Sequence, residues 1–105
     1  MTDDQIEVRD APDRDRYEIL VGGERAGFAQ YVRRGSRTFF VHTEIDPEFE
    51  GKGLGSRLAA GALAEERTKA KIVPLCPFIR GFIDRHPEEL EYVDKELLAQ
   101  IDAGC

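Results

Sequence analysis

The chain has 105 residues and a formal net charge of −6, with 41% hydrophobic and 34% charged residues. This length fits one domain with one hydrophobic core, and the mixture of apolar and charged residues excludes intrinsic disorder. The acidic balance disfavours nucleic acid and mildly favours cationic partners, and no apolar run approaches the roughly 20 residues that cross a bilayer. We therefore expect a single domain over residues 1–105 with no nucleic-acid or membrane partner.

The N-terminus and the cysteines bear on location and on metal binding. Residues 1–5 show no basic start and no apolar stretch, so we expect a cytoplasmic protein rather than a secreted one. Cys76 and Cys105 are expected to be free thiols, because Cys105 is the last residue. No metal site is predicted, since there is no Cys-x-x-Cys pair and His42 and His86 lie far apart in the sequence.

The first half of the chain has the pattern of antiparallel strands. A short alternating run at residues 6–8 predicts an edge strand, and residues 10–16 form a polar connection. Longer runs rich in β-branched and aromatic residues follow, with Gly22-Gly23 as a two-residue turn and residues 34–37 as a second turn. These runs predict three strands of a meander, at residues 17–21, 24–33 and 38–45.

The second half changes to a helical period. Leu54, Leu58 and Ala62 recur at i, i+4 and i+8, which predicts an amphipathic helix from Gly53 to about Ala70. The remaining elements follow from apolar runs and caps: a strand at 72–75, a helix that begins at Cys76-Pro77 and stops before Pro87, and a terminal helix at 94–101 with Asp94 as its N-cap.

This order predicts an α+β fold: a mostly antiparallel sheet with a β-α-β-α C-terminal half and helices packed on the sheet. Pro74 lies inside the fourth of the main strands and cannot donate a ladder hydrogen bond. We therefore expect an open seam between the strands at 38–45 and 72–75.

The segment from Glu50 to Ser56, Glu-Gly-Lys-Gly-Leu-Gly-Ser, follows a strand and opens a helix. Backbone N–H groups converge there at the positive end of a helix dipole, which makes an anion-binding loop. Its glycines would let a pyrophosphate approach the backbone, and Lys52, Ser56 or Arg57 would add side-chain contacts. The alternative is that the glycines only shape a tight strand-to-helix turn.

Two other phosphate-binding loops do not match this segment. A P-loop requires Gly-Lys followed by Ser or Thr, whereas Gly51-Lys52 is followed by Gly53. The dinucleotide fingerprint requires Gly or Ala where Ser56 stands and a repeated parallel β-α-β unit. Hydrolysis of nucleoside triphosphates and nicotinamide or flavin chemistry are therefore disfavoured.

The same segment resembles the acetyl-coenzyme A loop of the GNAT superfamily of N-acetyltransferases, whose signature is Gln/Arg-x-x-Gly-x-Gly/Ala. Here the pattern is Glu50-x-x-Gly53-x-Gly55, and residues 42–55, 73–78 and 86–88 together resemble the minimal, stand-alone branch of the superfamily over roughly 27–93. The resemblance implies central strands that splay apart with the pantetheine of acetyl-CoA between them. It implies cofactor contacts at Ile45, Gly51, Lys52, Gly53, Leu54, Gly55, Ser56 and Phe78.

Two departures from the family pattern matter. Glu50 replaces the usual Gln or Arg, so backbone amides must do most of the pyrophosphate binding. The few residues at 10–16 cannot hold the helices that most members insert between the first two strands to build the acceptor site. We therefore expect an open acceptor side.

The strand at 38–45 carries two titratable candidates. Strict alternation places Phe40, His42 and Glu44 on one face and the apolar residues with Thr43 on the other. Glu44 would act as general base, directly or through water, and His42 would assist it. The alternative is that both side chains lie on a solvated sheet face.

Cys76 stands where a strand ends and a helix begins, a position that favours a reactive thiol. The resemblance places it near the coenzyme A thiol, where it would accept the acetyl group or donate a proton to the leaving thiolate. The alternative is a small buried hydrophobe. His86 is interpreted as a helix C-terminal cation, and Arg33, Arg34 and Arg37 as a solvated turn.

The leading hypothesis is an acetyl-CoA-dependent N-acetyltransferase that modifies an exposed primary amine of a small molecule or peptide. Cys76, Glu44 and His42 would be nearest the chemistry. A rival hypothesis is a non-catalytic module that binds coenzyme A or uses its open face for protein contacts. A purely structural α+β domain remains if no cofactor binds.

Overall fold

The computed structural model describes residues 5–104. It contains a five-stranded sheet in the order β1-β2-β3-β4-β5, in which β1 to β4 are antiparallel neighbours and β5 pairs parallel to β4. The strands are β1 (Ile6–Ala11), β2 (Arg16–Val21), β3 (Glu24–Arg34), β4 (Arg37–Ile45) and β5 (Lys71–Pro74). The α+β fold with one parallel step is as predicted.

Three α-helices follow the antiparallel strands: α1 (Leu54–Glu66), α2 (Pro77–Arg85) and α3 (Lys95–Ala103). Short 3-10 helices connect the elements: η1 (Pro12–Arg14), η2 (Pro47–Phe49) and η3 (Pro87–Tyr92). The N-cap at Asp94 is confirmed, because its carboxylate accepts the backbone N–H of Leu97 at 3.1 Å. None of the helices in the described part of the chain is long and apolar enough to cross a membrane.

Most element boundaries differ from the sequence expectation by one or two residues, and two differ by more, at the end of β1 and at the end of α1. β1 extends to Ala11 rather than Val8, because Asp10 and Ala11 continue the ladder opposite Tyr17 and Arg16. α1 ends at Glu66, and the four residues after it form turns rather than a last helical turn.

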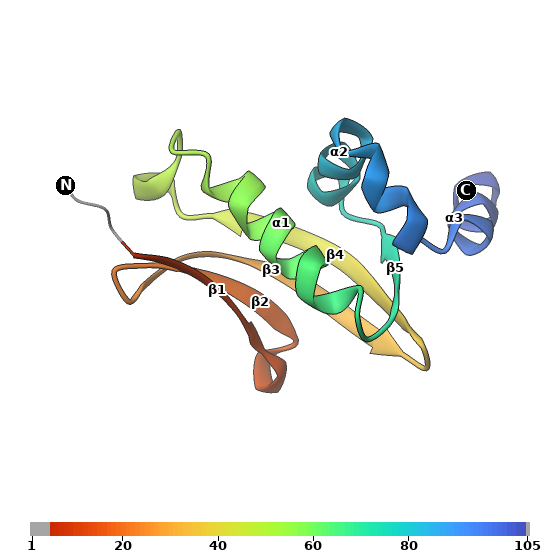
Figure 1. Cartoon of the computed structure of the whole chain (residues 1–105), viewed down its shortest axis with the longest axis horizontal. Coiled ribbons are helices and arrows are strands. Elements are labelled where there is room, and N and C mark those ends of the chain that lie inside the picture. The colour runs from red at the N-terminus through yellow and green to blue at the C-terminus, as the bar shows by residue number, and fades with distance from the viewer. Residues whose placement is uncertain (1–4, 105) are drawn as a thin grey trace.

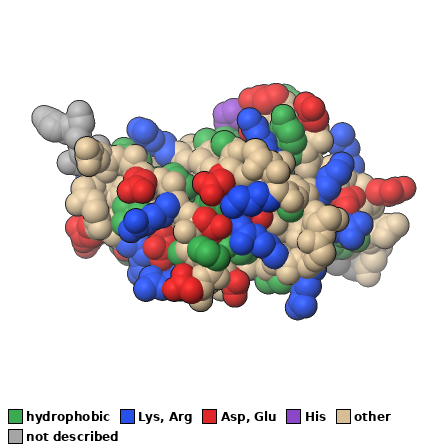
Figure 2. Space-filling model, turned by 60° about the horizontal axis from the view of Figure 1, so that its bottom comes forward, with side chains coloured by type: hydrophobic (Ala, Val, Ile, Leu, Met, Phe, Trp, Pro, Cys, Tyr) green, Lys and Arg blue, Asp and Glu red, His purple; other side chains and the backbone are tan. Residues whose placement is uncertain are grey.

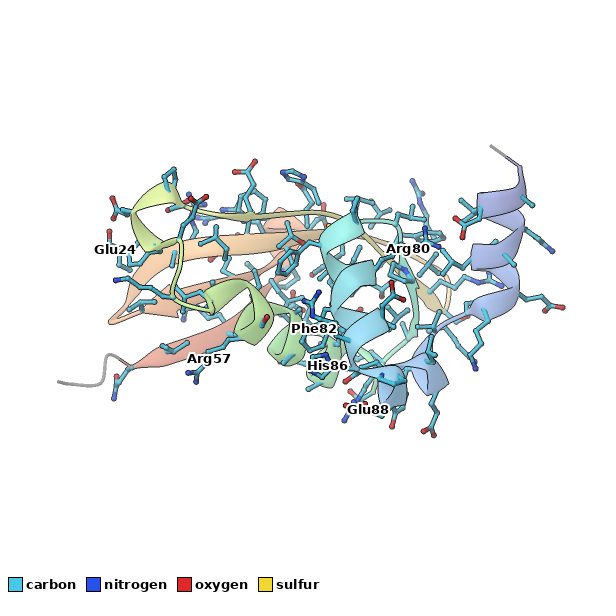
Figure 3. All side chains as sticks on the ribbon, turned by 90° about the horizontal axis from the view of Figure 1, so that it is seen from above. Glu24, Arg57, Arg80, Phe82, His86 and Glu88 are labelled. Atoms are coloured by element: carbon cyan, nitrogen blue, oxygen red, sulfur yellow. The ribbon has the colours of Figure 1, made fainter. Side chains whose placement is uncertain are left out.

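α1 and α2 lie on the same face of the sheet, which Figures 1 and 3 show from two directions. Between them and the sheet lies one core, built from aromatic side chains of the strands and aliphatic side chains of the helices, among them Tyr17, Tyr31, Phe40, Leu58 and Ile79. The opposite face of β1 to β4, called the outer face below, has no helix over it among residues 5–104. On the face shown in Figure 2, acidic and basic side chains are interspersed.

A buried carboxylate anchors the C-terminal end of α1 to the sheet. Glu66 is fully buried and accepts hydrogen bonds from the Tyr17 hydroxyl at 2.7 Å, the Thr38 hydroxyl and Arg33. The Arg33 guanidinium binds both carboxylate oxygens, at 2.7 and 2.8 Å, and also reaches Asp10 at 2.9 Å. This bidentate geometry is the strongest form of such a pair.

The interpretation of the arginines near the β3–β4 turn as a solvated turn is wrong for two of them. Arg33 binds Glu66 and Asp10, and Arg37 binds the Asp94 carboxylate at 2.7 Å. Glu66 and Asp94 lie far from these arginines in the sequence. They become neighbours because α1 and the segment before α3 fold back beside β3 and β4.

Candidate functional site

The strands β4 and β5 separate where Pro74 ends β5. Pairing covers Arg37 to Phe40 of β4, and the backbone N–H groups of Leu75 and Cys76 then both donate to the Phe40 carbonyl, at 3.0 and 2.8 Å. Beyond Phe40, β5 no longer runs beside β4. The predicted seam between these strands is confirmed.

The second half of β4 therefore presents a free backbone edge. The N–H of Asp46 donates to the Ala26 carbonyl of β3 at 2.8 Å. Because backbone groups point to alternate sides along a strand, those of Thr43 and Ile45 point away from β3 and into the seam. An extended molecule in the seam can pair with them as a sixth strand would.

A cavity of about 370 Å³ continues from this edge to the N-terminus of α1. Its lining comes from β4, the loop after it, the first turn of α1 and the start of α2: Thr43, Ile45, Phe49, Glu50, Gly51, Gly53, Leu54, Gly55, Ser56 and Phe78. The cavity thus joins an open strand edge to a helix dipole.

The N-terminus of α1 is left uncapped by any side chain. Gly53 is its N-cap, and among residues 5–104 no side-chain cap accepts a hydrogen bond from the first-turn N–H groups. The amides of Leu54, Gly55 and Ser56 have no acceptor within the helix, because these are first-turn positions. Three aligned donors at the positive end of a helix dipole are the arrangement that the sequence analysis predicts to bind an anion, and the binding itself stays a prediction.

The glycines of the loop serve two different purposes. Gly51 and Gly53 have φ angles of 83° and 73°, which L side chains rarely adopt. Gly55 has ordinary helical backbone, but a Cβ built on it would lie 2.6 Å from Cζ of Phe78. Gly55 is therefore needed to admit the Phe78 ring, which rests on the first turn of α1.

The residues predicted to contact the cofactor lie together around the cavity, with one exception, and their contact with a cofactor stays a prediction. Lys52 does not line the cavity; it is exposed beside it, with its Nζ 5.9 Å from the centroid of the Phe49 ring. Sequence reasoning missed Thr43 and Phe49 as lining residues. Glu50 also lines the cavity, which places a carboxylate beside the anion site.

The prediction that His42 and Glu44 share a sheet face with Phe40 is wrong, because β4 contains a β-bulge. Tyr31 pairs with Phe40 and Gln30 with His42, so β4 has an extra residue at Val41. Past the bulge the alternation is shifted, so Phe40 shares the helix-covered face with Thr43 and not with His42. His42 and Glu44 lie on the outer face.

On the outer face, His42 and Glu44 form a solvated pair. Nε2 of His42 lies 2.8 Å from Oε2 of Glu44, and the two side chains are 54% and 59% exposed. Phe28 lies beside them, with its ring centroid 6.1 Å from that of His42, and the Arg16 guanidinium covers the Phe28 ring at 4.7 Å. The His42–Glu44 pair therefore lies on the face of the sheet opposite to the cavity, on the part of β4 that β5 does not pair with.

Cys76 lies where the two strands separate. Its side chain is buried, with 3% exposure, at the N-cap of α2, and its thiol donates to Oγ1 of Thr43 at 3.3 Å. It is a free thiol, and Cys105 lies outside the described residues. The structure therefore brings Cys76 to the inner end of the seam but places Thr43 between it and the cavity.

His86 ends α2, as expected. Its Nδ1 lies 2.9 Å from the Phe82 carbonyl, and its ring stacks on that of Phe82 at 4.1 Å between centroids. Figure 3 shows both rings in the space between α2 and α1, whereas Arg57 points outward from α1. His86 thus caps a helix and takes no part in the cavity.

A family model described as GCN5-related N-acetyl-transferase matches residues 16–93, which is most of the chain. The chain belongs to this family. The match spans β2 to the end of η3 and so includes the seam, the cavity and the uncapped helix end. Family membership supports acetyl transfer as the general activity.

A solved structure has the same fold as this GCN5-related domain. The solution structure of a GCN5-like protein from Staphylococcus aureus superposes with a TM-score of 0.62 at 17% identity, over 83% of this chain and 86% of that one. At 17% identity, this comparison shows that the two chains share a fold. A search of the curated proteins finds no match.

Proposed function

We propose that the chain is an acetyl-CoA-dependent N-acetyltransferase that acts on an exposed primary amine. The observation that carries this proposal is the continuity of the cavity, which runs from the uncapped N-terminus of α1 to the free edge of β4. A diphosphate at one end and an extended amide-containing arm at the other match these two features.

The residues present fit coenzyme A in three places. The amides of Leu54, Gly55 and Ser56 would hold the diphosphate, and the exposed Lys52 of the same loop would add a positive charge beside the cavity. The free backbone groups of Thr43 and Ile45 would pair with the pantetheine amides. Apolar side chains along this path, Ile45, Phe49 and Phe78, would cover the arm.

Bound in this way, the thioester would lie at the inner end of the seam, beside Thr43, whose hydroxyl contacts the thiol of Cys76. The acceptor amine would approach from the outer face, because α1 and α2 cover the other one. There the His42–Glu44 pair would take the proton that the amine loses on attack. The uncovered outer face would admit amines of varied size.

The experiment is release of free thiol from acetyl-CoA in the presence of polyamines, lysine peptides or small amines. Glu44→Gln should lower kcat by at least about tenfold if the carboxylate serves as base. Glu24→Gln, at the exposed first residue of β3, is the matched control and should leave the rate unchanged. Equal rates for the two variants would remove Glu44 from the chemistry.

A non-catalytic coenzyme A-binding module is the second candidate. The outer face favours this second function, because no helix of residues 5–104 covers it to form an acceptor-binding site. Such a module would bind acetyl-CoA with the same contacts but would not accelerate thiol release with any amine. The wild-type assay therefore separates the two functions.

A further inference from the structure

Thr43 occupies a position that the sequence did not single out. Its side chain lines the cavity, and its backbone lies on the free edge of β4. Its hydroxyl also contacts the thiol of Cys76 at 3.3 Å. Thr43 therefore touches both the space for a bound thioester and the buried thiol behind it.

The direction of this hydrogen bond matters for the chemistry. The thiol donates and the Thr43 oxygen accepts, so the hydroxyl proton of Thr43 remains available for another acceptor. Cys76 itself does not line the cavity, so any proton it supplies must pass through a neighbour. Thr43 is that neighbour.

We infer that Thr43 and Cys76 form a proton relay to the leaving sulfur of the thioester. The inference rests on the proposed function. When the amine attacks and the C–N bond forms, the C–S bond breaks and its electron pair goes to sulfur. The Thr43 hydroxyl donates its proton to that sulfur and takes the Cys76 thiol proton in the same step. Cys76 is left as a thiolate. Once the product leaves, it regains a proton by the same path in reverse: the Thr43 hydroxyl gives its proton to the thiolate and takes one from water in the cavity.

The relay conserves protons and keeps its acid apart from its base. The Cys76 thiol gives up one proton through Thr43, and the leaving sulfur gains one. The proton that the amine loses goes to the outer face at His42 and Glu44, on the other side of β4. The acid and the base therefore lie on opposite faces of one strand.

The kinetic test uses side chains of matched size. Thr43→Val removes the hydroxyl but keeps the shape, and it should lower kcat by about a hundredfold with little change in the KM for acetyl-CoA. Thr43→Ser keeps the hydroxyl and should recover most of the rate. Cys76→Ala should match Thr43→Val, and the double variant should be no slower than either, because the two groups act as a unit. Thr68→Val, at an exposed hydroxyl after α1, is the control.

A second readout needs neither ligand nor turnover. The infrared S–H stretch of Cys76 should lie at lower frequency in the wild type and in Thr43→Ser than in Thr43→Val, because a donated hydrogen bond weakens the S–H bond. The difference spectrum between the wild type and Thr43→Val isolates this thiol from Cys105. Identical spectra would show that the thiol does not donate to Thr43, which contradicts the relay.

The outcomes distinguish the relay from the function on which it rests. A wild type that releases no thiol with any amine refutes the proposed function and the relay with it. An active wild type with Thr43→Val at the same kcat refutes the relay alone. If Cys76→Ala is inactive while Thr43→Val is not, the thiol attacks the acetyl group directly and the relay is wrong.

Discussion

The two ends of helix α1 are built in opposite ways. At its N-terminus, a glycine in the left-handed region leaves the first backbone donors without a side-chain cap, facing an open cavity. At its C-terminus, Glu66 is fully buried and three side chains satisfy its carboxylate. One end keeps its hydrogen-bonding capacity for a ligand, and the other uses it to hold the fold. Substitutions at the two ends should therefore separate binding from stability.

The largest effect is expected from Glu66→Ala. The substitution leaves Arg33 with Asp10 but without the bidentate carboxylate, and it leaves the Tyr17 and Thr38 hydroxyls without their acceptor inside the core. Loss of one partner of such a pair costs about 3–5 kcal/mol of unfolding free energy. Denaturant unfolding should show this loss for Glu66→Ala but not for Glu65→Ala, one residue away and exposed. Equal losses would mean that the network does not stabilise the C-terminal end of α1.

The same network should make stability depend on acid. Burial alone would raise the pKa of Glu66, but hydrogen bonds from Arg33, Thr38 and Tyr17 outweigh it and lower the pKa from 4.5 to about 2. A lowered carboxyl pKa stabilises the fold above the unfolded value and ceases to do so as pH falls through the folded one. The stability difference between the wild type and Glu66→Gln should therefore be constant above about pH 4.5 and shrink from there toward pH 2. A difference that grows on acidification would contradict this assignment.

At the other end of α1, Gly53→Val should abolish acetyl-CoA binding. Valine disfavours the φ of 73° and places a side chain where a phosphate must approach the amides. We expect Kd to rise by at least about a hundredfold, equivalent to about 2.7 kcal/mol, by calorimetry. Gly35→Val at the β3–β4 turn is the matched control, because it imposes similar strain at a φ of 60° away from the cavity. Unchanged affinity in Gly53→Val would remove the loop from the binding site.

The smallest effect concerns Gly55 and the ring that lies on it. Alanine in a helix is normally favoured over glycine by about 0.4–1 kcal/mol. In the wild-type background the new methyl group meets the Phe78 ring, so this gain should be cancelled or reversed. In a Phe78→Ala background the full gain should appear in thermal unfolding. The same gain in both backgrounds would mean that the Phe78 ring does not rest on Gly55 in solution.

The features that local sequence determines were predicted correctly. The element order follows from periodicity and turn residues, and Pro74 indicates where β5 must stop pairing. The uncapped start of α1 follows from glycines at a strand-to-helix junction, and its binding of an anion stays a prediction. Each of these depends on residues that are close together in the chain.

The features that the sequence did not reveal depend on long-range packing. Nothing at Val41 marks it as the extra residue of a bulge, because the bulge is defined by the register against β3. Strict alternation, which ignores the bulge, placed Thr43 on the correct strand but on the face opposite to Phe40. Arg33 and Glu66 are ordinary charged residues in the sequence, and only the fold pairs the exposed Arg33 with the buried carboxylate of Glu66.

The central claim is that the uncapped end of α1 and the open edge of β4 bind acetyl-CoA. The direct test is the melting temperature of the wild type and of Gly53→Val, each with and without saturating ligand. Ligand at about 100 times its Kd adds roughly 2.7 kcal/mol, or on the order of 10 °C for a domain of this size. A shift of that size in the wild type, absent from the variant, is the predicted result, whereas no shift in the wild type at millimolar acetyl-CoA would contradict the claim.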